Sequence, residues 1–181
     1  MKRSLAILLA ASLASSAAFA APHVHGAGKL EVVIDGAHFA VTLDMPAESA
    51  VGFERMPRTA AEKLAVEGML KALSDGPGLF KPTPAAECRL ATVDLSTPFS
   101  PATDKPAGKE KAADAGNGDN GEHGDIEASY VFQCAKPEQL KSLETTIFTR
   151  FKRLYRLEVE RAGPSGQGAG MLTPKQPKLN W

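Results

Sequence analysis

The chain has 181 residues, 43% of them apolar, and its 21 basic residues balance its 21 acidic residues. This length accommodates one domain or at most two. A formal net charge of zero lacks the positive excess by which proteins bind the phosphates of nucleic acids, so we exclude nucleic acid as a partner.

The first 20 residues have the pattern of a secretory signal peptide. Lys2 and Arg3 form a positive n-region, residues 5–13 form an apolar h-region, and the Ala-Phe-Ala of residues 18–20 is an A-x-A cleavage site. The apolar run is shorter than the about 20 residues that a helix needs to span a bilayer. We therefore expect an exported, periplasmic protein that does not span the membrane after signal cleavage. Its mature chain, residues 21–181, is predicted to be a single domain.

Two cysteines in an oxidising compartment predict one disulfide bond. Cys88 and Cys134 each lie in a stretch with the composition of a strand, so the bond would join two neighbouring strands. The alternative is a pair of thiol metal ligands or a redox pair, although the spacing has no C-x-x-C character.

The apolar pattern predicts strands together with one main helix. Residues 29–34 and 38–43 form a hairpin around the turn signal Asp35-Gly36. Thr59 and Glu62 have the spacing of a capping box and begin a helix that stops at residues 75–77. Further strands are expected around both cysteines and at residues 155–159 and 168–172, with a short helical turn at residues 151–154. Residues 142–148 fit both strand alternation and helical spacing, and their β-branched and aromatic residues favour a strand.

Residues 96–124 have a different composition, rich in proline and glycine among charged residues, and only Phe99 could anchor them to a core. Such a segment buries too little apolar surface to offset its ordering entropy. We predict a disordered insertion at about residues 96–124 and a loose tail at about residues 174–181. The fold class expected for the rest is α+β, an antiparallel sheet with one main helix, cross-linked by one disulfide.

Two histidine clusters have metal-binding character. His23 and His25 follow the predicted cleavage site, and residues i and i+2 of an extended chain point the same way, so both imidazoles could share one ion. This pair supplies two of the three or four ligands that zinc needs. The alternative interpretation of the two histidines is a polar N-terminus that binds no metal. His123 and Asp125 add an imidazole and a carboxylate as further possible ligands. The alternative for this second cluster is a solvated acidic loop that binds no metal.

Sequence motifs of common enzyme classes are absent from the chain. There is no nucleophile elbow, no H-E-x-x-H motif and no glycine-rich phosphate loop. We therefore expect a protein that is not an enzyme. A basic stretch is typical of a solvated face or of a contact for an acidic partner. It consists of Lys141, Arg150, Lys152, Arg153 and Arg156.

Several short motifs occur along the chain in a specific order. They are His23-Val24-His25-Gly26, Gly52-Phe53-Glu54, Leu79-Phe80 followed by Cys88, Glu122-His123-Gly124-Asp125, Ser129-Tyr130-Val131-Phe132-Gln133-Cys134, Gly166-Gln167-Gly168-Ala169 and Leu172-Thr173-Pro174. This order resembles the ZrgA-like family of periplasmic zinc-regulated proteins, formerly a domain of unknown function. The resemblance covers essentially the whole mature chain.

The resemblance implies a zinc-binding protein that assists zinc uptake alongside an ABC importer. It makes His23, His25 and His123 candidate zinc ligands, with Asp125 as a weaker fourth; copper or nickel would compete for them. Many relatives have a histidine- and aspartate-rich tract in the insertion, of which only His123 remains here. Relatives also often have histidine after Gly-Phe-Glu, where this chain has Arg55. Both differences lower the expected zinc capacity.

Two hypotheses about function follow. The first is a periplasmic accessory protein that captures or buffers zinc and assists its import. The second is a disulfide-linked interaction module that docks on an envelope partner without binding metal. Zinc binding by the purified protein distinguishes the two.

Overall fold

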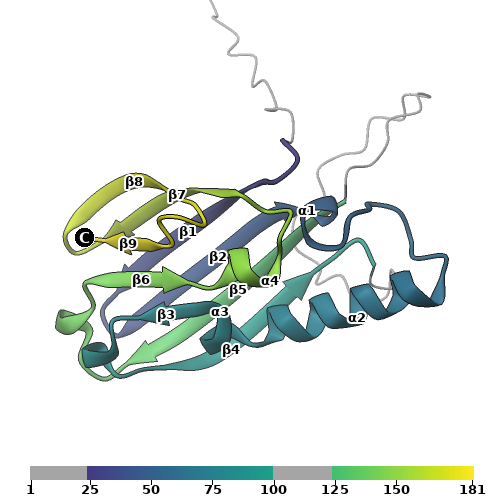
Figure 1. Ribbon diagram of the computed structural model, residues 1–181. Helices are drawn as coiled ribbons and strands as arrows, with labels where there is room; N and C mark the ends of the chain where they lie inside the picture. The colour runs from purple at the N-terminus through teal and green to yellow at the C-terminus, as the bar shows by residue number, and fades with distance from the viewer. Residues whose placement is uncertain (1–23, 100–123) are drawn as a thin grey trace, which may run out of the picture.

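The computed structural model describes residues 24–99 and 124–181 (Figure 1). The predicted signal peptide and most of the predicted insertion lie outside these residues. The strands are β1 (Ala27–Asp35), β2 (His38–Pro46), β3 (Phe80–Pro82), β4 (Cys88–Ser96), β5 (Asp125–Cys134), β6 (Ser142–Thr145), β7 (Arg156–Gly163), β8 (Gly166–Leu172) and β9 (Lys178–Asn180). The helices are α1 (Ala47–Val51), α2 (Ala60–Ser74), α3 (Gly76–Leu79) and α4 (Ile147–Arg150), with 3₁₀ turns η1 (Pro84–Ala86) and η3 (Pro137–Gln139).

The strands form a six-stranded sheet in the order β4-β5-β2-β1-β7-β8 and a three-stranded sheet in the order β3-β6-β9. The expected antiparallel pairing is found between most neighbours, but β1 and β7 are parallel. The prediction of a purely antiparallel sheet is therefore wrong at this pair. Side chains alternate with a period of two in both kinds of pairing, so periodicity could not show it.

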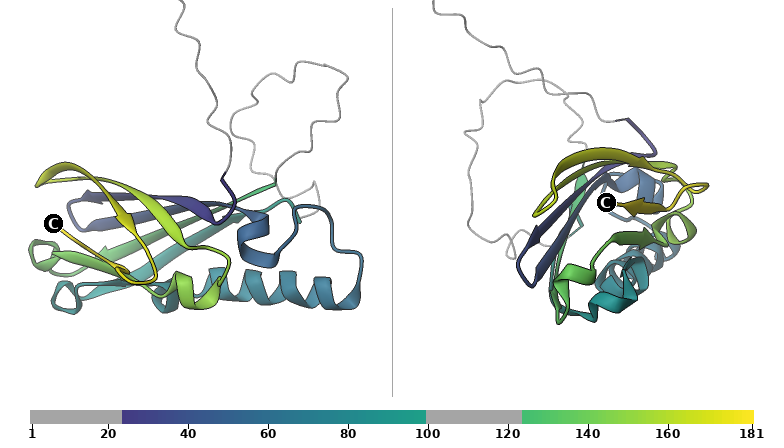
Figure 2. Two further views of the ribbon diagram at one scale, coloured as in Figure 1. Left: turned by 45° about the horizontal axis from the view of Figure 1, so that its top comes forward. Right: turned by 90° about the vertical axis from the view of Figure 1, so that its left-hand side faces the viewer.

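The six-stranded sheet buries one face, and α2 and the small sheet both lie over that face (Figure 2). Tyr130 on β5 shows how the layers meet. Its ring packs edge-on against Phe80 of β3, with centroids 5.1 Å apart, and its hydroxyl donates a 2.7 Å hydrogen bond to the carbonyl of Leu73 in α2. Burial raises the pKa of the Tyr130 phenol, so this hydroxyl keeps its proton.

Helix α2 begins at the predicted capping box, which is confirmed. The Thr59 hydroxyl accepts from the backbone N–H of Glu62, and the Glu62 carboxylate accepts from the backbone N–H of Thr59. Three buried residues at helical spacing, Val66, Met69 and Leu73, face the sheet. No helix within residues 24–99 and 124–181 is long and apolar enough to cross a membrane.

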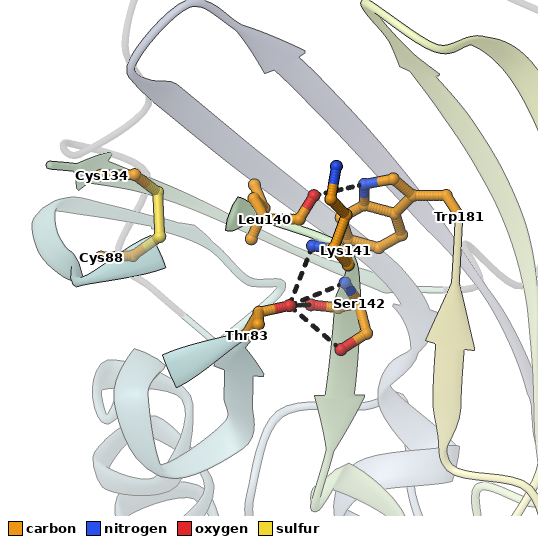
Figure 3. The surroundings of a disulfide bond; sticks show 7 residues. All are labelled: Thr83, Cys88, Cys134, Leu140, Lys141, Ser142 and Trp181. Carbon is orange, nitrogen blue, oxygen red and sulfur yellow. Dashed lines mark hydrogen bonds between the residues drawn. A yellow bond between two sulfur atoms is a disulfide. The ribbon is translucent and has the colours of Figure 1, made fainter. Parts of the chain in front are cut away.

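The disulfide between Cys88 and Cys134 is confirmed, and it joins the neighbouring strands β4 and β5 as predicted (Figure 3). The two cysteines face each other at one end of the strand pair. The residues that lead into the connection between the two strands lie at the other end. The disulfide therefore holds together the end of the strand pair that lies opposite the connection.

The tail expected to be loose from residue 174 is instead ordered, which corrects that prediction. Strand β9 pairs with β6, and the Trp181 indole N–H donates to the Leu140 carbonyl at 2.9 Å (Figure 3). The Arg161 guanidinium also lies 5.8 Å from the centre of the Trp181 ring. The prolines that suggested a loose tail precede the strand, and one aromatic side chain anchors its end.

Replacing both cysteines in a Cys88→Ser/Cys134→Ser variant should lower the free energy of unfolding by about 2–4 kcal/mol, because the disulfide restricts the unfolded chain. Urea denaturation measures the change. Reduced wild-type protein should lose the same amount, which controls for the substitutions themselves. A variant as stable as the oxidised wild type would show that the bond is dispensable.

Arg55 and Glu62 form an ion pair that ties the loop after α1 to the start of α2. The two Arg55 Nη atoms lie 3.1 and 2.6 Å from the two Glu62 carboxylate oxygens. The Arg55 guanidinium also lies 5.4 Å from the centre of the Phe53 ring. The hydrogen bonds from Arg55 and from the backbone N–H of Arg58 lower the pKa of the Glu62 carboxyl from 4.5 to about 2.

This low pKa predicts a pH-dependent contribution to stability. Since the folded-state pKa of Glu62 lies below its ordinary value, the contribution is present above about pH 4.5 and is lost as the pH falls toward 2. Glu62→Gln should therefore melt below wild type at pH 7, and the gap should narrow at pH 3. Thermal melting at both pH values is the measurement, with Glu67→Gln on the same helix as control. An equal difference in melting temperature between wild type and Glu62→Gln at both pH values would contradict the lowered pKa of Glu62.

Candidate functional site

The strands β1 and β5 begin at the same end of the main sheet. Asp125 at the start of β5 pairs with Pro46, and Lys29 pairs with Asp44, which places the start of β1 level with Pro46. Only β2 lies between β1 and β5, so their first residues are about 10 Å apart. The sequence could not establish this convergence of the two histidine-bearing segments.

Helix α1 contacts both segments. The backbone N–H of Gly26 donates a 3.0 Å hydrogen bond to the buried Ser49 hydroxyl, and the backbone N–H of Ala47 donates a 2.9 Å bond to the Gly124 carbonyl. Figure 1 shows α1 beside the start of β1. One short helix therefore links the chain just after His25 to the chain just after His123.

The backbone at His25 is held from its other side by the segment before β7. The Tyr155 hydroxyl donates a 2.9 Å hydrogen bond to the His25 carbonyl, and the backbone N–H of Tyr155 donates to the Gly26 carbonyl at 2.9 Å. Gly26 has a φ of +75°, and a Cβ there would come within 2.0 Å of the Tyr155 ring. The fixed backbone presents the His25 imidazole to solvent, with 65% of the side chain exposed.

The carboxylate of Glu48 lies between two basic side chains. Its Oε2 atom is 3.4 Å from Nδ1 of His25, and its Oε1 atom is 3.4 Å from Nη1 of Arg153. The guanidinium of Arg153 lies against Gly52, where a Cβ would be 3.0 Å from its nitrogens. The glycine of the Gly-Phe-Glu motif therefore leaves room for the arginine that contacts Glu48.

The rest of the Gly-Phe-Glu motif lies against both described ends of the insertion. Phe53 packs edge-on against Phe99, with ring centroids 5.7 Å apart, which confirms Phe99 as an anchor. A Cβ at Gly124 would come within 2.6 Å of Pro98 and 3.5 Å of the Glu54 carbonyl. The chain thus enters and leaves the insertion at one place, beside α1.

Of the predicted ligands, His25 and the half-buried Asp125 lie at this end of the sheet, whereas His23 and His123 lie outside the described residues. No group of three or more histidine, cysteine, aspartate or glutamate side chains that could hold a metal is found in the part of the chain that the structure describes. Both cysteines are committed to the disulfide, so neither is a thiol ligand.

Glu48 is the residue that sequence reasoning missed at this end. It lies in the first turn of α1, a helix of five residues, which is too short to show an apolar period. Its only local signal was an acidic residue shortly after Pro46, which ends β2. Arg153, expected on a solvated or partner-binding basic stretch, is exposed and also contacts Glu48.

Comparison with known proteins agrees with the motif order. A family model described as ZrgA family zinc uptake protein matches residues 22–181, which include both histidine clusters and the residues around α1. No curated protein matches the chain. The resemblance inferred from the sequence is confirmed, and the chain belongs to the ZrgA family of zinc uptake proteins.

Proposed function

We propose that the protein is a periplasmic, non-enzymatic accessory that captures or buffers zinc and assists its import, and that zinc binds at the end of the main sheet beside α1. The observation that carries this proposal is the convergence of the segment at His25 with the segment at Gly124 and Asp125. Membership of a zinc uptake family supports it.

The chemistry of the side chains at this end of the sheet suits zinc. Imidazole nitrogens and carboxylate oxygens are ligands that zinc accepts, and copper and nickel compete for the same donors. The His25 side chain is mostly exposed, so an ion can enter and leave without an opening of the fold. Such access suits a protein that passes zinc on to components of an ABC importer.

The predicted ligands outside the described residues are consistent with this location. His23 lies two residues before His25, and His123 directly precedes Gly124. An ion at His25 would thus have further imidazoles within a short length of chain from both segments. Arg55, which replaces the histidine common in relatives, holds the start of α2 and gives the site no ligand.

Calorimetric titration of the purified, untagged mature protein with zinc should show uptake of about one ion per chain. His25→Ala should weaken binding at least tenfold because an imidazole ligand is lost, and His23→Ala and His123→Ala should also weaken it. His38→Ala is the matched control, since His38 begins β2 at the opposite end of the sheet.

Titration heats equal to those of buffer would refute zinc capture at this end of the sheet. A loss of zinc affinity in His38→Ala as large as that in His25→Ala would refute it as well. Crosslinking that recovers the same envelope partner with and without a chelator, from a protein that takes up no zinc, would instead support the interaction module.

A further inference from the structure

We infer that Glu48 is a zinc ligand that shares one ion with His25, and that Arg153 is the cation that occupies this carboxylate when zinc is absent. The inference rests on the proposed zinc-binding function and names one of its ligands. Neither the family motifs nor the histidine clusters pointed to Glu48.

The distance between the two donor atoms carries the argument. Nδ1 of His25 and Oε2 of Glu48 are 3.4 Å apart, the distance of a long ion pair. Zinc binds imidazole nitrogen at about 2.0–2.1 Å and carboxylate oxygen at about 2.0–2.2 Å in a tetrahedral arrangement. Two such ligands on one ion lie about 3.4 Å apart. The observed separation of Nδ1 and Oε2 therefore equals that of two ligands of one zinc ion.

Hydrogen bonds of neighbouring residues hold the backbones at His25 and Glu48 side by side. The residue after His25 donates a hydrogen bond to the residue after Glu48, through the Gly26 N–H and the buried Ser49 hydroxyl. The backbone N–H of Gly52 in turn donates to the Glu48 carbonyl at 2.8 Å and closes α1. The Glu48 side chain is 27% exposed, so its position is restricted while the His25 side remains open to an incoming ion.

Arg153 balances the charge of Glu48 in the protein without zinc. Its Nη1 atom lies 3.4 Å from Oε1, the oxygen that does not face His25. A guanidinium carries its charge at all relevant pH values, so it repels a divalent ion bound at the other oxygen. Removing Arg153 should therefore strengthen zinc binding, whereas removing the charge of Glu48 should weaken it.

Zinc titration of Glu48→Gln and Arg153→Gln tests the inference. We expect the dissociation constant to rise at least tenfold in Glu48→Gln and to fall about threefold or more in Arg153→Gln. Glu144→Gln, which removes an exposed carboxylate on β6 in the small sheet, should stay within about twofold of wild type.

Thermal melting provides a second readout that separates a ligand from a merely structural residue. Glu48→Gln should lose the zinc-induced rise in melting temperature shown by wild type, where the rise is the difference measured for each protein with and without zinc. Unchanged zinc affinity in Glu48→Gln, with wild type still binding, would overturn this inference and leave the proposed function intact. Equal or weaker binding in Arg153→Gln would refute the role of Arg153. A wild-type protein without zinc uptake would overturn both proposals.

Discussion

The parallel pairing of β1 with β7 is the constraint on which the candidate site depends. Parallel strands begin at the same end of a sheet, so the residues that precede β7 lie beside those that precede β1. This brings Arg153 and Tyr155 next to His25 and Gly26, across more than half of the sequence. An antiparallel β7 would place its preceding loop at the other end, and Glu48 would lose its basic neighbour.

Three of the motifs that carry the family resemblance meet at this junction, namely those that contain Gly26, Gly52 and Gly124. A Cβ at Gly26 would meet the Tyr155 ring and a Cβ at Gly124 would meet Pro98, whereas Gly52 has a φ of +89°, which residues with side chains rarely adopt. These three glycines therefore permit the close contact of β1, α1 and β5. The His25 imidazole and the Glu48 carboxylate belong to residues that lie beside these contacts.

The features that could be predicted from the sequence are those with a local signal. The Asp35-Gly36 turn indicated the first hairpin, the Thr59 and Glu62 spacing indicated the start of α2, and two cysteines after a predicted signal peptide indicated the disulfide. The parallel pair and strand β9 depend on contacts between distant segments, which have no local pattern. For the same reason, His25 and Asp125 were predicted as ligand candidates, whereas Glu48 was not.

The described residues on either side of the connection between β4 and β5 are held by contacts with the rest of the domain. Phe99 packs on Phe53 before it, the Gly124 carbonyl accepts from Ala47 after it, and the disulfide holds the far end of the same strand pair. Doubling the length of a flexible loop costs only about 0.6 kcal/mol. Because these contacts hold both of its ends, the sequence between residues 99 and 124 can change in length, composition and histidine count at little cost to the contacts of the described residues.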